Sequence, residues 1–342
     1  MKKNLLLTIA LSCCMFLQAQ TQQAEKPMWG KQDVYLARQT EKTFKLINDI
    51  LQEKKNLPSK KAPSLERKAA LYLMDAVLHD TRMDGSPVIT QFIEDRYETI
   101  LEDMKKPLKK GLKIYKLYND GFVVKSKSVT IAWDIVRGVK MKETPKLISD
   151  EIIRKLVDQC DIMFLSHNHG DHVDKDVVNM FIEAGKPVVA PTNVLKKNEK
   201  VIHTRSEEIV EKSFTAANGI ELHTTILPGH QDKLMNNIYV VTTPEGYTFT
   251  QTGDQWNKED LSWVLDVHKH IKPLDVLMIN CWANSLPETV KGFNPKLVLF
   301  GHENELGHTI DHREAYWLSY DKLEAVDRAK CLMTWAECYW YK

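Results

Sequence analysis

Five apolar segments in the later part of this sequence end in histidine or aspartate, and this pattern constrains the fold more than any other feature. Short apolar segments of this kind are typical of buried strands. Loops converge on a ligand site at strand ends in layered sheets, so we expect these side chains to share one site. The polar residues at the five ends are Asp134; His167, His169, Asp171 and His172; His230; Asp254; and His302.

Strands and helices alternate after residue 111, which predicts an α/β domain of sheets covered by helices. The segment 112–135 is rich in β-branched and aromatic residues, and Asn119-Asp120-Gly121 is a turn signal between two strands. Further strands are expected at 161–166, 187–191, 239–245, 247–254, 275–282 and 296–303, and helices at 174–185 and 258–271.

Residues 20–110 are predicted to form a helical region ahead of a layered domain over 111–342. Phe44, Ile47 and Leu51 follow helical spacing, and Ser64 is a suitable N-cap for the Leu- and Ala-rich segment after it. No potential ligands cluster here, and His79 stands alone on a predicted helix. The region could be a helical cap or a docking surface.

The first 19 residues resemble an export signal. Lys2 and Lys3 form a basic start, residues 5–17 an apolar stretch, and Ala19 offers a small residue for cleavage. This predicts a periplasmic or secreted protein, with a lipid-anchored form through Cys13 as the alternative. No later apolar run reaches the roughly 18 residues that span a membrane.

Four cysteines follow the signal, and their spacing matches no zinc-ribbon pattern. In an oxidising compartment Cys331 and Cys338 could form a disulfide, whereas Cys160 precedes an apolar strand and is expected in the core. The formal net charge of +1 gives no electrostatic case for a nucleic-acid partner.

The residue types at the strand ends indicate metal chemistry. Imidazole nitrogens and carboxylate oxygens suit zinc, manganese or iron, and clustered cysteines for a thiolate site are missing from the sequence. The segment HNHGDH, residues 167–172, places two histidines two positions apart and an aspartate and a histidine beyond them. The whole set offers enough groups for two divalent ions, zinc above all.

HNHGDH resembles the H-x-H-x-D-H signature of the metallo-β-lactamase-fold hydrolases. The further motifs follow in that family's order: Asp134 before the signature, then LPGH with His230, TGD with Asp254 and FGH with His302. The resemblance covers roughly residues 112–312, and its finer features are most similar to the ascorbate-6-phosphate-lactonase and phospholipase-D-like branch. It implies a four-layer αββα sandwich, here with an N-terminal helical extension.

By this resemblance, one ion is bound by His167, His169 and His230, and the other by Asp171, His172 and His302. Asp254 bridges both ions, and Asp134 orients a ligand histidine. A hydroxide between the ions attacks the substrate, and Asp171 orients the water or transfers its proton. An aspartate at position 254, where true β-lactamases carry a cysteine ligand, argues against β-lactam cleavage.

Residues near the motifs could contact the substrate, although capping, packing or solvent-facing roles are the default expectation for them. A phosphate-bearing substrate would require a basic residue such as Lys233 or Arg313 near the ions. The histidines outside any motif, at 203, 223, 268 and 270, are expected to pack or face solvent. The remaining candidates are Glu303, Glu305, His308, His312, Asn280, Trp282 and Asn284.

The sequence therefore predicts an exported binuclear metal-dependent hydrolase that cleaves an ester, lactone or phosphodiester bond in a small-molecule or lipid-like substrate. Two alternatives stay open: a di-iron redox protein on the same fold, and a non-catalytic binding module that the metal stabilises. The complete ligand set argues against the module, and the lack of a flavin domain or rubredoxin-like cysteines argues against the redox protein.

Overall fold

The computed structural model describes residues 28, 30–78, 87–138, 146–205, 207–231, 234–255, 260–283 and 285–342. The chain divides into two compact units, residues 1–42 and residues 43–342, and the second contains all the described strands. The predicted export signal with Cys13, and also His79, Lys233 and Asn284, lie outside the described residues. Within the described part, no helix is both long and apolar enough to cross a membrane.

Two seven-stranded sheets form the centre of the second unit. The first has the order β14-β1-β2-β3-β4-β5-β6 and contains β1 (Leu112–Lys116), β2 (Phe122–Lys125), β3 (Thr130–Trp133), β4 (Ile162–Phe164), β5 (Val188–Pro191), β6 (Ile202–Thr204) and β14 (Glu337–Tyr341). The second has the order β13-β12-β11-β10-β9-β8-β7 and contains β7 (Val210–Thr215), β8 (Glu221–Gln231), β9 (Leu234–Thr242), β10 (Thr248–Gln251), β11 (Val276–Asn280), β12 (Leu297–Gly301) and β13 (Lys330–Cys331).

Parallel pairing brings the polar strand ends together within each sheet. In the first sheet β3 runs parallel to β4, with Ile131 opposite Ile162, so both strands end at the same edge. In the second sheet β10, β11 and β12 are parallel neighbours, with Met278 opposite Leu299. The strands that precede the predicted ligands therefore end side by side.

Alternate strand residues face two different apolar layers, as the pleat requires. Trp133 and Phe164 of the first sheet and Phe249 of the second lie in the layer between the sheets, where the Trp133 ring is 5.5 Å from Phe164 and 5.7 Å from Phe249. Fully burying a large apolar side chain of this kind contributes about 1.5–3 kcal/mol.

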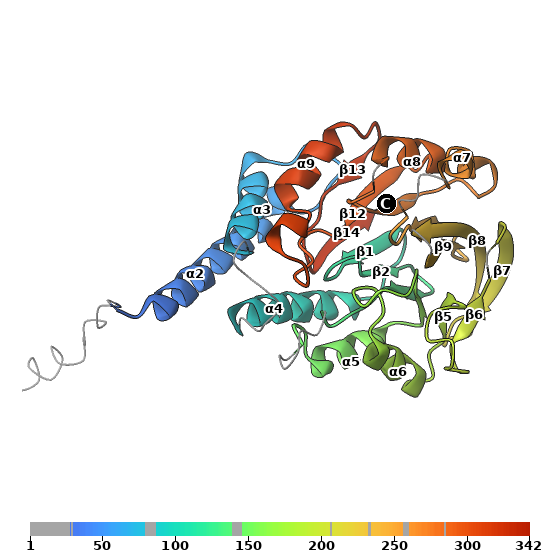
Figure 1. Cartoon of the computed structure of the whole chain (residues 1–342), viewed down its shortest axis with the longest axis horizontal. Helices are drawn as coiled ribbons and strands as arrows, with labels where there is room; N and C mark the ends of the chain where they lie inside the picture. Colours follow the sequence, from blue (N-terminus) through green and yellow to red (C-terminus); the bar gives the residue numbers. More distant parts are fainter. Residues whose placement is uncertain are drawn as a thin grey trace, which may run out of the picture. The chain divides into compact units, whose positions relative to one another are not determined.

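Helices cover the outer faces of both sheets. Figure 1 shows α4, α5 and α6 along one side of the two sheets and α8 and α9 along the other. The predicted four-layer αββα sandwich is confirmed. The described helices are α2 (Gln32–Gln52), η1 (Lys54–Asn56), α3 (Leu65–Leu78), α4 (Pro87–Met104), α5 (Asp150–Gln159), α6 (Lys175–Glu183), α7 (Leu261–Val264), η3 (Val267–Lys269), α8 (Leu286–Phe293), η4 (Ile310–His312) and α9 (Tyr316–Glu324).

Helices α3 and α4 are attached to the C-terminal end of the chain by buried arginines. Arg67 of α3 forms an ion pair with Glu337 of β14 at 2.6 Å, with both side chains buried. Arg96 of α4 donates from Nε to the Trp335 carbonyl at 2.7 Å. The predicted helices of this region are present, and the boundary placed at residue 110 stays a prediction.

Two local predictions are wrong. The single helix expected over 258–271 is interrupted, because α7 ends at Val264 and only the short η3 follows. Gly292 of α8 packs directly on the Val264 carbonyl, and this contact places the chain against α8. Cys331 and Cys338 are free thiols, and they lie on β13 and β14, which belong to different sheets. Cys160 is buried, as expected.

Candidate metal centre

Six of the seven predicted ligands meet where the loop after β4 faces the ends of β10 and β12. The ligand atoms of His167, His169 and Asp254 all lie within 4.8 Å of one another. Those of Asp171, His172 and His302 form a second group with the same spacing. Donor sets of three histidines and carboxylates at this spacing can each bind one divalent ion.

The Asp254 carboxylate lies between the two groups. Its Oδ2 atom is 3.2 Å from His167 Nε2 and 3.7 Å from His169 Nδ1. Its Oδ1 atom is 3.1 Å from His172 Nε2 and 3.6 Å from His302 Nε2. One carboxylate thus faces both groups, which is the arrangement that a bridging ligand requires.

Two glycines allow the strand ends to approach this closely. Gly253 has a φ of +53°, and a Cβ atom there would lie 2.5 Å from Ser166 Cβ in the loop after β4. At Gly301 a Cβ atom would collide with the carboxylate of Asp120. The TGD motif therefore needs glycine for both the conformation and the contact, and the FGH motif needs it for the contact.

Asp134 fixes the orientation of His172. Its Oδ2 atom is 3.0 Å from His172 Nδ1 and accepts hydrogen bonds from Ser166 Oγ at 2.6 Å and Gln251 Nε2 at 3.1 Å. Because a carboxylate holds Nδ1, Nε2 of His172 faces the centre and is the nitrogen that can bind a metal ion. Ser166 Oγ is also 3.0 Å from His167 Nδ1 and holds that ring in the same way.

Two asparagines hold the carboxylates. Asn280 donates from Nδ2 to Asp254 Oδ1 at 2.6 Å, and Asn119 donates to the Asp171 carbonyl at 2.9 Å and to Asp171 Oδ2 at 3.3 Å. Asn280 was a candidate for lining a pocket, whereas Asn119 was interpreted only as a turn residue. The turn interpretation is correct for the backbone, since Asn119 has a φ of +55°, but the same turn directs an amide at the site.

Asp120 is a further buried carboxylate next to the centre that sequence reasoning missed. One of its ligand atoms lies within 4.8 Å of those of Asp134 and His172, and Gln251 donates from Nε2 to Asp120 Oδ2 at 2.8 Å. Burial raises the pKa of Asp120 to about 7. The only signal in the sequence was its place beside Asn119, which a turn already explained.

His230 stands apart from both groups of three within the described part of the chain. Its Nδ1 atom is 3.2 Å from Asp260 Oδ2, and its backbone amide donates to Gln255 Oε1 at 2.8 Å. The side chain is 43% exposed. Asp260 holds the ring through Nδ1 and leaves Nε2 as the atom that can bind an ion, the same arrangement as in the Asp134–His172 pair.

The neighbouring histidines determine the ionisation of the carboxylates in the centre. Burial acts to raise the pKa of Asp254, but His172, His167 and His302 hold it well below the usual range. Burial likewise opposes ionisation of Asp171, whose pKa is nevertheless lowered by His172 and His302. Two ionised carboxylates in a buried site need compensating positive charge.

The histidine nitrogens also fit metal ligation better than hydrogen bonding. Within the described structure, Nε2 of His167 and Nε2 of His172 are buried and make no hydrogen bond, although each lies near Asp254. Buried imidazole nitrogens normally have a partner. Nε2 of His167 and Nε2 of His172 are therefore available to bind a metal ion.

The other candidates from the sequence divide between the centre and the scaffold. The Trp282 ring is 5.1 Å from the ring of His302 and borders the centre, and His308 packs on Trp282 with its ring at 5.4 Å. Arg313 donates to the backbone carbonyls of His308 and Leu78 and so has a structural role.

Two glutamates of the candidate set have structural contacts, and the remaining histidines lie outside the two ligand groups. Buried Glu303 forms an ion pair with Lys116, and Glu305 accepts from Gly307 N at 2.8 Å. His312 is exposed beside Asp311. His203 and His268 contact the carbonyls of Val194 and Gly292, and exposed His223 lies beside Ser213, so these histidines pack or face solvent as expected.

A surface hollow of about 740 Å³ adjoins the ligand loop through Asn168, which lies between His167 and His169 in the sequence. Four lysines and one glutamate are the ionisable side chains in its lining, and none of the lysines has a carboxylate partner within the described residues. The basic residues near the centre are therefore Lys175, Lys196, Lys197 and Lys200.

No family model matches the chain, and no curated protein matches it by sequence. Among solved structures, the chain is similar to Igni18, a metallo hydrolase from the archaeon Ignicoccus hospitalis. The two are 14% identical, the match covers 68% of this chain and 99% of Igni18, and the TM-score is 0.51. The chain has the metallo-β-lactamase fold.

Two further solved structures resemble this fold more distantly. CmlA, a diiron β-hydroxylase from Streptomyces venezuelae, is 13% identical over 69% of this chain and 55% of its own, with a TM-score of 0.49. A Thermotoga maritima protein assigned to the zinc-dependent hydrolases of the metallo-β-lactamase superfamily is 15% identical over 63% of this chain and 86% of its own, with a TM-score of 0.34.

Proposed function

We propose that this protein is a binuclear metal-dependent hydrolase that cleaves an ester, lactone or phosphodiester bond. The observation that supports it is the pair of ligand groups joined by one carboxylate, Asp254. The first ion would be held by His167 and His169 together with His230, and the second by Asp171, His172 and His302. Zinc is the metal that we expect, and manganese or iron can occupy the same donor set.

Two divalent ions in this position would lower the pKa of a water towards neutrality and polarise the scissile group. Asp171 would orient that water and take up its proton at a carboxylate oxygen; its Oδ2 atom lies at the centre, 3.1 Å from His302 Nε2. Trp282 covers the ring of His302 and restricts the access of bulk water on that side.

The substrate is proposed to be a small or lipid-like molecule that carries negative charge. The hollow beside the ligand loop offers four lysines without carboxylate partners in the described structure, and Glu199 is its one acidic lining residue. Ammonium groups attract phosphate or carboxylate groups and steer anionic ligands towards a site. An anionic ester, lactone or phosphodiester would place its charge there and its scissile bond beside His169.

The direct test is metal analysis of the purified chain followed by turnover of a panel of esters, lactones and phosphodiesters. We expect about two ions per chain and hydrolysis of at least one anionic substrate. His169→Ala should abolish turnover in a folded protein, whereas His223→Ala, an exposed histidine outside the centre, should leave it unchanged. Undiminished turnover by His169→Ala would overturn the proposal.

A chelator separates the hydrolase from a binding module stabilised by metal. Ligand-linked stability predicts that removing the ions lowers the thermal unfolding midpoint in both cases. The hydrolase also loses turnover and regains it with zinc. A large stabilisation by metal with no turnover on any substrate would favour the binding module.

A further inference from the structure

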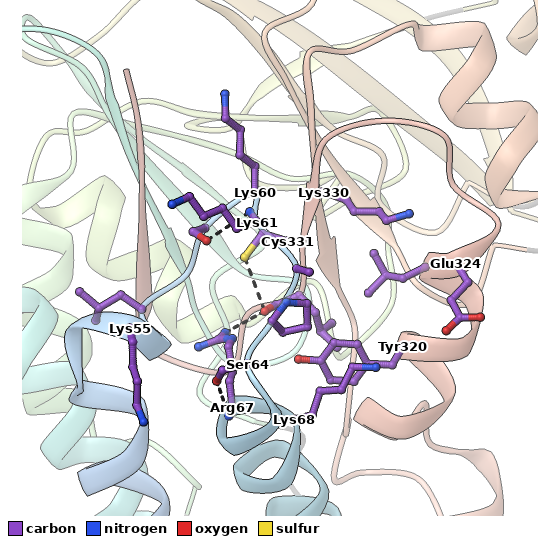
Figure 2. A pocket seen from close by; sticks show the side chains of 16 residues that line it. Lys55, Lys60, Lys61, Ser64, Arg67, Lys68, Tyr320, Glu324, Lys330 and Cys331 are labelled. Atoms are coloured by element: carbon purple, nitrogen blue, oxygen red, sulfur yellow. Dashed lines mark hydrogen bonds between the residues drawn. The ribbon is translucent and has the colours of Figure 1, made fainter.

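A second pocket lies between the segment 55–68, helix α9 and strand β13, and Figure 2 shows it from close by. Its volume is about 340 Å³, within the range of sites that bind small molecules. No ligand of the metal centre lines it. We call it the α3–α9 pocket; its lining includes Lys60, Lys61, Ser64, Tyr320, Leu323 and Leu332.

The polar side chains at the floor of the α3–α9 pocket are held by hydrogen bonds to neighbouring protein groups. Ser64 caps α3, accepting from Arg67 N at 3.0 Å and donating from Oγ to Asn56 Oδ1 at 2.5 Å. The Arg67 guanidinium donates to both Glu337 oxygens, at 2.6 and 2.8 Å, and to the Leu332 carbonyl at 2.8 Å. Ser64 and Arg67 therefore shape the pocket, and other lining residues are the candidates for binding a ligand.

Tyr320 supplies an unused hydroxyl. Its side chain is only 6% exposed, and its hydroxyl has no hydrogen-bond partner within the described residues. Figure 2 shows this hydroxyl directed from α9 towards the opposite wall of the pocket. Buried hydroxyls are normally paired. Burial raises the pKa of Tyr320, so the group keeps its proton and can donate it to an acceptor on a ligand.

Positive charge dominates the rim. Lys60 and Lys61 have no carboxylate partner within the described part of the chain, and the Lys68 ammonium lies 5.0 Å from the centre of the Tyr320 ring. Lys55 is neutralised by Glu66 at 2.9 Å. Because Glu324 is the one acidic side chain in the lining, the pocket retains an excess of positive charge.

The walls are apolar. Leu57, Pro63, Leu323 and Leu332 line them, and burial raises the pKa of the Cys331 thiol to about 12, so this group is neutral. Apolar walls favour a hydrocarbon body, while the tyrosine hydroxyl and the lysines favour an acidic head.

We propose that the α3–α9 pocket binds an organic anion with an apolar body, such as a medium-chain carboxylate. The carboxylate accepts a hydrogen bond from Tyr320 and faces Lys60 and Lys61, and the chain lies against Leu323 and Leu332. This site is separate from the metal centre and does not depend on hydrolysis.

Isothermal titration calorimetry of the full chain with decanoate, decanol and acetate tests the proposal. A hydrogen bond to a charged group together with apolar burial predicts one decanoate per chain and binding about tenfold tighter than that of decanol. Acetate, which has the charge without the body, should show no saturable binding at the same concentrations. Equal affinity for decanoate and decanol would overturn the proposal.

Three variants connect the binding to this pocket. Tyr320→Phe and the double variant Lys60→Gln with Lys61→Gln should each weaken decanoate binding by about tenfold. Ala62→Trp, at an exposed lining position, should fill the pocket and abolish binding. Lys291→Gln, at an exposed lysine of α8, is the matched control.

Thermal unfolding of each variant checks that the protein is still folded. The proposal is contradicted if decanoate binds Ala62→Trp as it binds the natural chain. It is equally contradicted if the tyrosine and lysine variants match the Lys291→Gln control.

Discussion

Replacing Asp134 by asparagine should weaken the binding of the second metal ion about 10–100-fold while leaving the fold intact. In the structure the Asp134 carboxylate accepts from Ser166 N at 2.8 Å and from Ser166 Oγ at 2.6 Å, and it faces His172 Nδ1 at 3.0 Å. Asparagine keeps the shape of the side chain and one acceptor oxygen. Its other terminal atom becomes an NH₂ group, which can only donate.

The consequence is a change of tautomer. If the amide NH₂ faces His172, then Nδ1 must become the acceptor, and the ring proton moves to Nε2, the atom that faces Asp254 and the second ion. Substitutions of carboxylates that orient metal-bound histidines typically cost about 10–100-fold in metal affinity or activity. That range corresponds to about 1.4–2.7 kcal/mol. We expect the full effect, because His172 is completely buried and cannot turn to use its other nitrogen.

Equilibrium dialysis against buffered free zinc measures this change. The natural chain should fill both sites, and Asp134→Asn should require about 10–100-fold more free zinc for its second ion, with turnover reduced in parallel. Asp161→Asn is the matched control, because Asp161 accepts a backbone hydrogen bond from Thr130 at 2.8 Å at the opposite end of β3. Two tightly bound ions in Asp134→Asn would refute the tautomer argument.

Three other predictions concern the substrate, the strand approach and acid stability. The double variant Lys196→Gln with Lys197→Gln should raise KM for anionic substrates several-fold and leave kcat unchanged, because these charges attract the substrate. Adding about 0.5 M salt to the natural chain should have the same effect, because salt screens exposed charges. An unchanged KM would contradict the proposed role of the hollow. Gly253→Ala should reduce metal content, measured by elemental analysis, because its Cβ atom would collide with the loop after β4; a full complement of ions would show that the loop can yield. Arg67 holds the pKa of buried Glu337 below the usual 4.5, so this ion pair stabilises the fold above that pH and the contribution is lost as the pH falls through the lower, folded-state value. In urea unfolding at pH 7, Glu337→Gln should cost about 3–5 kcal/mol, because it leaves the arginine charge buried and unpaired, and the cost should shrink in acid; a cost that is independent of pH would contradict the linkage.

The meeting of six of the seven candidate side chains could be predicted from the sequence because local geometry determines most of it. Residues 167–172 occupy one loop after one strand, so their mutual positions follow from a few backbone torsions. Asp254 and His302 follow parallel strands, and parallel strands end at the same edge. We expected His230 to lie with the others, whereas the structure places it outside both groups of three, with its ring held by Asp260, 30 residues further along the chain.

Other features depend on contacts that no local pattern contains. Asn119 and Asn280 support the centre through single side-chain amides, and amides of this kind also occur in ordinary turns. The free Cys331 and Cys338 lie on strands of different sheets, which spacing alone could not show. The α3–α9 pocket joins residues 55–68 to residues 320–332, and only the tertiary fold brings these segments together.

A crystal structure of the zinc-loaded protein, with anomalous data collected at the zinc edge, tests the central claim most directly. The account predicts two peaks about 3.5–4 Å apart on either side of the Asp254 carboxylate, one beside His167 and His169 and the other beside His172 and His302. A single peak, or zinc bound away from Asp254, would contradict it.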